Sequence, residues 1–193
     1  MYQNILTDEQ FLSWLLCCDR DLAEKARQGG CPRCGGRLHR ANYPRKPRGG
    51  PAGGAPELSL RFSFCCAQDG CRRRVTPPSL RFLGRRVYLG LVLVLVQVLR
   101  SGASPARASE IEQLVGASAH TLRRWRRWWQ TTLVASRFWR AACGQFCERL
   151  NPRELPQALL DRFSGDARER MHGLLRFLAP ISGGAAADQE RVP

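Results

Sequence analysis

Two short cysteine pairs constrain the fold of this chain more than any other feature. Cys31 and Cys34 lie in the segment CPRCGG, and Cys66 and Cys71 are separated by four residues after an alternating apolar segment. Two such pairs supply the four soft thiolates that a structural Zn²⁺ binds in tetrahedral geometry. The spacing predicts a zinc ribbon. Because four protein ligands leave no position for an activated water, we expect the zinc to be structural and not catalytic.

The third ligand has two candidates, because Cys65 and Cys66 are adjacent. Neighbouring side chains of an extended chain point to opposite faces, so only one of them reaches the metal. We assign Cys66, which keeps phase with the alternating apolar residues of segment 58–64 and leaves the shorter gap to Cys71. His39 is an alternative ligand, but in so basic a loop we expect it to contact phosphate or solvent.

The remaining cysteines have a simpler interpretation. In predicted helices we expect them to be small buried hydrophobic residues. Cys143 and Cys147, which are four residues apart, form an alternative chelating pair for a second metal. The remaining cysteines are Cys17, Cys18, Cys143 and Cys147.

The N-terminus and the apolar segments predict a cytoplasmic location. The start, MYQNILTDEQ, has neither the basic nor the apolar region of a signal peptide. The longest apolar run, Val87 to Leu99, has 13 residues, short of the roughly 20 that span a bilayer. We therefore expect a protein of the bacterial cytosol or nucleoid, with reduced thiols and no membrane partner.

The patterning predicts a mainly α protein with a small β zinc ribbon. We expect a helix over residues 7–28 with a Thr7/Gln10 capping box, a half-buried strand over 58–64, and a mobile loop in NYPRKPRGGPAGGAP. The run 87–100 predicts a helix, although its β-branched content leaves a strand open. Further helices are expected over 106–115, from Ser118 through Cys143 after a turn at Gly116, and over 167–178, with a frayed tail at 182–193.

These elements divide the chain into four parts. We expect an N-terminal helix (1–30), a zinc ribbon with a basic loop (31–80), a helix-turn-helix domain (81–141), and a C-terminal helical segment with a disordered tail (142–193). The helix-turn-helix rests on apolar residues at the spacing that locks two short helices together, with Leu122 and Trp125 on the second helix.

The net charge of +15 is concentrated in the middle of the chain. Residues 31–90 hold thirteen basic and two acidic side chains, and residues 91–141 hold eight and two, whereas residues 142–193 balance at seven each. Of the 31 basic residues, 29 are arginines, whose planar guanidinium grips phosphate bidentately. The pattern indicates a polyanionic partner.

Three basic elements are candidate contacts to nucleic acid. The second helix of the helix-turn-helix carries arginines with no interleaved acid, a proline-rich arm extends from the ribbon, and a third cluster follows the last zinc cysteine. For Trp125, Trp128 and Trp129 the i, i+3, i+4 spacing favours a place in the core. The candidate residues are His120, Thr121, Arg123, Arg124, Arg126 and Arg127 on the helix, Arg45, Lys46 and Arg48 on the arm, and Arg72, Arg73 and Arg74 on the ribbon.

The order CPRCGG, strand, CCAQDGCRRRVTPPS, apolar helix and a helix ending LRRWRRWW resembles the N-terminal DNA-binding portion of bacterial insertion-sequence transposases with a zinc ribbon. The resemblance covers roughly residues 31–130. It implies zinc ligation by the four cysteines and a recognition helix over Ser118 to Trp129. In that family a later RNase H-like domain carries the catalytic acids. We expect a stand-alone relative without that domain, since the acids after Ala141 lack a strand framework.

The leading hypothesis is a non-enzymatic, sequence-specific DNA-binding protein, a transcriptional regulator or a transposition accessory. An RNA-binding or ribosome-associated zinc-ribbon module is the alternative, because Arg-rich arms serve there too. A zinc hydrolase or nuclease is disfavoured by the closed thiolate site and by a middle region with few acids. A protein-interaction adaptor that uses the C-terminal segment is compatible with the leading hypothesis.

Overall fold

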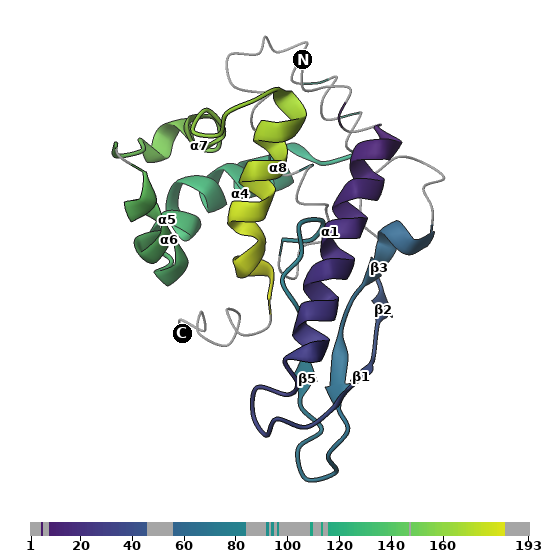
Figure 1. Ribbon diagram of the computed structural model, residues 1–193. Helices are drawn as coiled ribbons and strands as arrows, with labels where there is room; N and C mark the ends of the chain where they lie inside the picture. The colour runs from purple at the N-terminus through teal and green to yellow at the C-terminus, as the bar shows by residue number, and fades with distance from the viewer. Residues whose placement is uncertain are drawn as a thin grey trace.

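The protein is mainly helical with two small antiparallel sheets, as the patterning predicts (Figure 1). The computed structural model describes Ile5 and residues 8–45, 56–83, 92, 94, 96, 109, 113, 116–146 and 148–183. Of the predicted helices 87–100 and 106–115, five residues are described and all five are helical: Val92, Val94, Val96, Ser109 and Gln113. The rest of these helices, most of the predicted loop and residues 184–193 lie outside the described residues.

Helix α1 (Glu9–Gln28) opens the described chain. Its N-cap is Asp8, whose carboxylate accepts a hydrogen bond from the Phe11 N–H at 3.1 Å. The helix therefore begins later than the predicted residue 7, and the capping assignment to Thr7 is wrong. An aspartate satisfies an orphan N–H and complements the positive end of the helix dipole.

The ribbon, which is the part of the chain from residue 31 to residue 80, consists of short strands. β1 (Leu38–Arg40) pairs with β4 (Phe64–Cys66), which pairs with β5 (Arg74–Val75); β2 (Tyr43–Pro44) pairs with β3 (Leu60–Arg61). All pairings are antiparallel. Since Tyr43 and Pro44 belong to a strand, the prediction of a loop from residue 42 onward is wrong at its start.

The predicted strand over 58–64 is divided by the surrounding structure. A 3₁₀ turn (Pro56–Ser59) precedes β3, and the ladder is interrupted before β4. The expected alternation is reversed over residues 60–63, where Arg61 and Ser63 are buried while Leu60 and Phe62 are only half-buried, and it holds at Phe64. The reason is tertiary: the Arg61 guanidinium donates to the carbonyl oxygens of Pro77 and Ser182, which lie over that face.

The helices after the ribbon begin, among the fully described segments, with α4 (Ala119–Arg127) and its N-cap Ser118. Gly116 has φ +61, a left-handed turn that glycine adopts readily. Ser118 then caps α4, accepting from the Thr121 N–H. The helix continues through a π-helical turn (Trp128–Thr132) and α5 (Leu133–Ala135).

The single helix predicted from Ser118 through Cys143 breaks at Ser136, whose ψ is 152°. Its hydroxyl donates to the Leu133 carbonyl and accepts from the Trp139 N–H, which ends one helix and caps the next. The next helix is α6 (Arg137–Ala142), followed by 3₁₀ turns (Cys143–Gln145 and Pro152–Glu154), α7 (Gln157–Leu160), α8 (Ala167–Leu178) and a last 3₁₀ turn (Ala179–Ser182). The bounds of α8 agree with the predicted 167–178. The predicted frayed tail over 182–193 is wrong at its start, because Ser182 is buried in the last 3₁₀ turn and hydrogen-bonds to Ser79.

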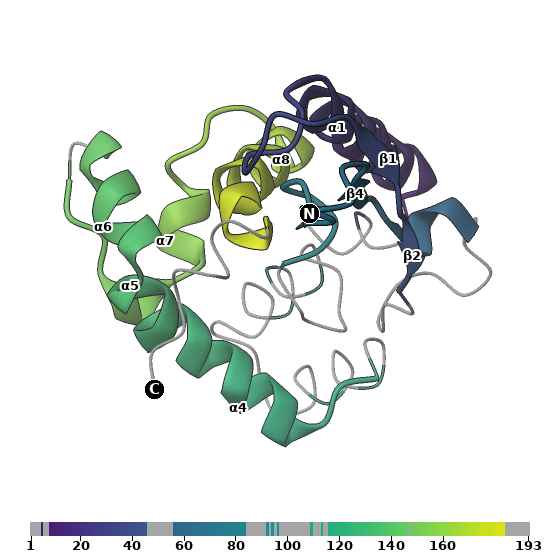
Figure 2. The same ribbon diagram turned by 90° about the horizontal axis from the view of Figure 1, so that it is seen from below.

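Two hydrophobic cores meet along α1. Phe11, Leu12 and Leu15 belong to a large core with Trp125 and Trp129 and with side chains of α7 and α8. Ala23, about two turns beyond Leu15, belongs to a small core of ribbon residues. Figure 2 shows α1 lying beside α8 on one side and β1 on the other.

Candidate metal centre

The four predicted metal ligands come together at the end of the ribbon. Cys31 follows the last turn of α1 through Gly29 and Gly30, and Cys66 ends β4, directly opposite Leu38 of β1. The ligand sulfurs of Cys31, Cys34, Cys66 and Cys71 all lie within 4.8 Å of one another. Cys31 and Cys66 are buried, whereas Cys34 is exposed and Cys71 half-buried. The group is thus anchored in the small core and reached from solvent on one side.

The sulfur spacing fits a single tetrahedral ion. The Sγ atoms of Cys31 and Cys71 are 3.7 Å apart, and those of Cys34 and Cys66 are 3.4 Å apart. A tetrahedron with metal–sulfur bonds of about 2.3 Å has sulfur–sulfur edges of about 3.8 Å. The residues present therefore fit a metal ion with four thiolate ligands.

Backbone amides face each of the four sulfurs in the same way. An amide two residues after each cysteine donates to its sulfur: Arg33 for Cys31, Gly36 for Cys34, Gln68 for Cys66 and Arg73 for Cys71; Cys31 also accepts from the Cys34 amide. Such contacts stabilise thiolates and orient the ligands. The two turns are thus equivalent binding halves, although one spans Cys-x₂-Cys and the other Cys-x₄-Cys.

The backbone after the second cysteine of each turn is left-handed. Gly35 has φ +70 and Arg72 has φ +45. The equivalence of the two turns requires this conformation at both positions, although only the first turn has a glycine there. Gly36 is needed for a different reason: a Cβ there would lie 2.7 Å from Gln68 Cγ and 3.2 Å from Cys66 Sγ.

The ionisation of the thiols reflects their crowding. The Arg33 amide, helped by other hydrogen bonds, lowers the pKa of the Cys31 thiol to about 6. At Cys34, Cys66 and Cys71 the corresponding amides act in the same direction. Desolvation and the protons shared among the sulfurs act against them and are stronger, so the net effect is a raised pKa for each of these three thiols. Four neighbouring thiols cannot all ionise by themselves, and a bound divalent cation would supply the missing positive charge.

The ambiguity between the adjacent cysteines is resolved in favour of Cys66. Cys65 pairs across the sheet with His39, and its thiol faces the Arg72 carbonyl oxygen at 3.4 Å. Neither Cys65 nor His39 belongs to the group of four sulfurs. Of the other cysteines, Cys17 is exposed, contrary to the expectation of burial, because it lies on the outer face of α1. Cys147, needed for the alternative second chelate, lies outside the described residues.

The predicted recognition helix is amphipathic. Leu122 and Trp125 are only 2% and 3% exposed and face the large core. Thr121 is half-buried beside Ser118. Five candidate contacts lie on the exposed side of α4: His120, Arg123, Arg124, Arg126 and Arg127.

The ribbon arginines are more engaged with the protein than the sequence suggests. Arg74 donates to the Ala41 carbonyl and the Ser63 hydroxyl, and its guanidinium lies 5.6 Å from the centre of the Tyr43 ring. Arg45 is half-buried and lies about as close to the Tyr43 and Phe82 rings. Of the predicted basic arm, then, Arg45 is held against the ribbon, and Lys46 and Arg48 lie outside the described residues.

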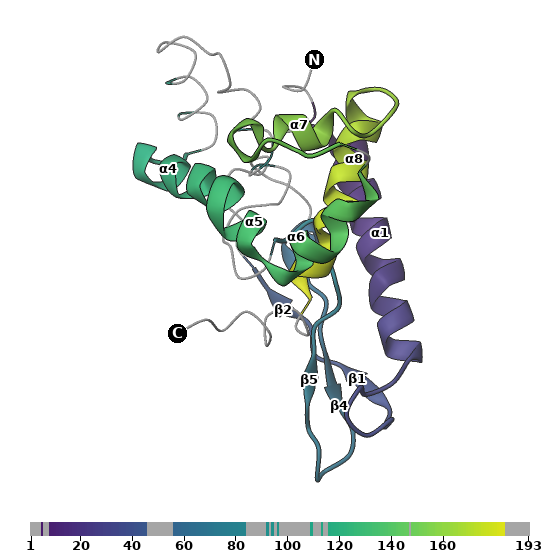
Figure 3. The same cartoon turned by 90° about the vertical axis from the view of Figure 1, so that its left-hand side faces the viewer.

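The remaining ribbon candidates, Arg72 and Arg73, are exposed. Arg72 makes a long ion pair of 3.7 Å with Asp69. Figure 3 shows that the β4–β5 loop, which carries these residues, and α4 lie at opposite ends of the molecule. The predicted basic residues therefore form separate surfaces.

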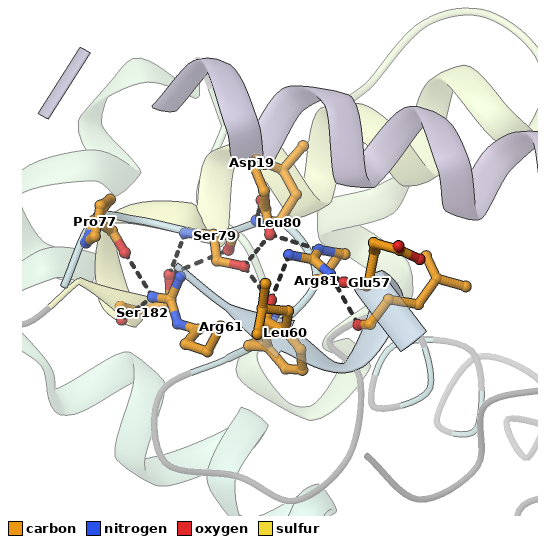
Figure 4. A network of polar contacts seen from close by, with 11 residues as sticks. Asp19, Glu57, Leu60, Arg61, Pro77, Ser79, Leu80, Arg81 and Ser182 are labelled. Atoms are coloured by element: carbon orange, nitrogen blue, oxygen red, sulfur yellow. Dashed lines mark hydrogen bonds and ion pairs between the residues drawn. The ribbon is translucent and has the colours of Figure 1, made fainter. Parts of the chain in front are cut away.

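Sequence reasoning missed a buried polar network where the two cores meet (Figure 4). Asp19 of α1 accepts from the Ser79 hydroxyl, the Leu80 N–H and the Arg81 guanidinium, at 2.5, 2.6 and 2.8 Å. Arg81 also donates to the carbonyl oxygens of Glu57, Leu58 and Leu60. The sequence signal that could have revealed this network is Asp19 itself, an acidic residue on the apolar face of the helix predicted over residues 7–28.

The second buried cation of this network is Arg61. Desolvation lowers the pKa of its guanidinium to about 10, which still leaves it charged at neutral pH. The Arg61 guanidinium donates hydrogen bonds to the carbonyl oxygens of Pro77 and Ser182. The Ser182 hydroxyl in turn accepts from the Ser79 N–H at 2.6 Å. The network thereby connects α1, the ribbon and the end of the described chain.

Within the described residues, every helix is too short or too polar to cross a bilayer. No protein family, curated protein or solved structure matches this chain.

Proposed function

We propose that this chain is a non-enzymatic DNA-binding protein in which one structural Zn²⁺ is held by Cys31, Cys34, Cys66 and Cys71. In this proposal helix α4 contacts double-stranded DNA, as in the transposase DNA-binding regions that the sequence resembles. The bound ion supplies a cross-link that holds the two ribbon turns together. It performs no chemistry, because four thiolates complete its coordination.

Zinc is favoured by the ligand set. Four thiolates in a tetrahedron are typical of zinc or of an iron–sulfur centre. The sulfur–sulfur distances of 3.4 and 3.7 Å suit one small ion. Elemental analysis of the purified protein is expected to give one zinc per chain and no iron.

The observation that carries DNA binding is the charge on α4. Its four arginines are exposed, and among the described residues no carboxylate lies within ion-pair distance of them. Arginines three and four positions apart on one helix repel one another. A row of phosphates would remove this repulsion and release condensed counterions. The burial of Leu122 and Trp125 holds the basic side outward.

Fluorescence anisotropy with a labelled 30-base-pair duplex tests this proposal. The double substitution Arg123→Gln/Arg127→Gln is expected to weaken binding and to reduce the slope of log K against log salt by about 1.8, because each phosphate contact contributes about 0.9. The matched control is Arg137→Gln/Arg140→Gln on α6, which removes two exposed charges away from α4.

Two results would contradict the proposal. Binding that is independent of salt would exclude phosphate neutralisation as the driving force. An equal loss in the α4 and α6 variants would show that only net charge matters. A duplex RNA of the same sequence is the comparison ligand, and tighter binding to it would replace DNA by RNA as the partner.

A further inference from the structure

A groove runs between α1 and β1, distant in sequence from α4. Two cavities of about 290 and 370 Å³ follow it and share Arg40 as a lining residue. Figures 1 and 2 both show α1 and β1 side by side here. β1 is an edge strand of its sheet, so the groove is not covered by another strand.

The groove is basic. It is lined by Arg20, Arg27, Arg37 and Arg40, and by the acids Asp21 and Glu24. Glu24 is already neutralised by Arg27, with which it makes two hydrogen bonds of 2.6 and 2.9 Å. In the described part of the chain, Arg20, Arg37 and Arg40 make no ion pair. Three guanidinium groups therefore face one remaining carboxylate.

The smaller cavity also has an aromatic wall. Phe62 and Phe64 line it together with Arg20, Arg40 and Asn42. Phe64 is buried in the ribbon core, whereas Phe62 packs against that core and stays half-buried. The buried Arg81 guanidinium, which does not line the cavity, lies 5.4 Å from the centroid of the Phe62 ring. Cations beside a partly exposed aromatic ring are the combination that binds a phosphate and a stacked base together.

The size and shape of the groove distinguish a single strand from a duplex. A duplex presents phosphates on a convex surface and keeps its bases stacked inside, so it cannot fill a cavity with an aromatic wall. A cavity of about 290 Å³ is near the lower end of the roughly 300–1,000 Å³ typical of ligand pockets. An unpaired nucleotide has this scale and an exposed base.

We propose that the groove between α1 and β1 binds single-stranded nucleic acid, with phosphates at Arg20, Arg37 and Arg40 and a base against Phe62. This inference deepens the proposed function, on which it rests for the class of partner. It assigns unpaired nucleotides to the ribbon end of the molecule and the duplex to α4. The two sites lie on different elements, so they can be tested separately.

Fluorescence anisotropy of the zinc-loaded full chain with labelled dT₁₂ and rU₁₂ tests the groove. The substitution Arg20→Gln/Arg40→Gln is expected to weaken binding of the 12-mers about tenfold or more and to leave duplex affinity within about twofold. The reverse is expected for Arg123→Gln/Arg127→Gln. Arg137→Gln/Arg140→Gln is again the control for net charge.

A second variant tests the base contact. Phe62→Leu keeps an apolar side chain but removes the ring, and it is expected to weaken dT₁₂ binding by about fivefold or more. An abasic 12-mer, which has the phosphates without the bases, should be bound equally by Phe62→Leu and the unaltered protein. Zinc content and circular dichroism of each variant establish that the ribbon is folded.

The outcomes separate the two proposals. Unchanged 12-mer binding in the Arg20/Arg40 variant, or no 12-mer binding at all, would overturn the groove while leaving the α4 proposal intact if the duplex still depends on Arg123 and Arg127. Equal losses for duplex and 12-mer in the groove variant would also overturn it. Preference for dT₁₂ or rU₁₂ identifies the sugar, and either preference supports the groove.

Discussion

The two cores of this protein are stabilised in different ways. Among the described residues, the ribbon core has five buried members, Ala23, Cys31, Leu38, Phe64 and Cys66, two of which belong to the candidate metal site. Over the same part of the chain the helical core has 24, including Trp125, Trp129 and Trp139. A core of five residues buries too little apolar surface to offset the conformational entropy of its strands. A metal cross-link, as proposed, would supply the stability that this small core lacks, whereas the helical part depends on packing.

The two cores are nevertheless joined. α1 contributes to both, and the Asp19 network crosses from the helix to the segment after β5 and to the last 3₁₀ turn. A buried ion pair adds little net stability but is costly to break, because the surviving charge is left without a partner. Three substitutions test how far the cores differ and how tightly they are coupled.

The largest effect is expected from Cys66→Ser. The binding free energy of a structural zinc, about 10–16 kcal/mol in zinc-finger peptides, is also folding free energy. We expect loss of stoichiometric zinc and of amide protection in β1 and β4. The tryptophan emission should hardly change, since all five tryptophans lie outside residues 31–80.

Cys65→Ser is the matched control, because Cys65 is adjacent but faces the Arg72 carbonyl. It is expected to retain one zinc per chain. Loss of zinc from this variant and not from Cys66→Ser would reverse the ligand assignment. A collapse of the tryptophan signal in Cys66→Ser would show that the helical core depends on the metal.

The second effect concerns the coupling between the cores. Asp19→Ala leaves Arg81 buried without its carboxylate and is expected to cost about 3–5 kcal/mol. Urea unfolding followed by tryptophan emission and by circular dichroism measures this loss, and both signals should shift together. Asp21→Ala, at an exposed position two residues away, should change stability by less than about 0.5 kcal/mol. A similarly small change for Asp19→Ala would mean that the network does not couple the cores.

The smallest effect has the opposite sign. Arg72→Gly relieves a left-handed backbone at φ +45 and is expected to stabilise the zinc-loaded ribbon by about 1 kcal/mol. The exposed pair with Asp69 that is lost contributes little. Amide exchange of β4 and β5 measures the change. Arg73→Gly is the control: it relieves no such strain, so it should not stabilise, and equal stabilisation by both would refute the explanation.

Much of the local structure could be predicted because it depends on neighbouring residues. The cysteine spacing, the Ser118 cap with its amphipathic helix and the bounds of α8 each depend on a few adjacent side chains. The inward orientation of Cys66 could also be predicted, because the alternation of side chains along a strand is a local property. The helix break at Ser136 was not, because a serine within an apolar periodicity is compatible with continuation as well as with a cap.

The sequence by itself determined the candidate metal ligands, the main helices of the described residues and the concentration of positive charge. Only the tertiary structure decided which charges are exposed. It buried Arg61 and Arg81, engaged Arg74 and Arg45 with the ribbon, and placed Arg20 and Arg40 in one groove with Phe62. The physical reason is that an arginine has the same charge in every sequence context, whereas its solvation and its partners come from segments far away in the chain.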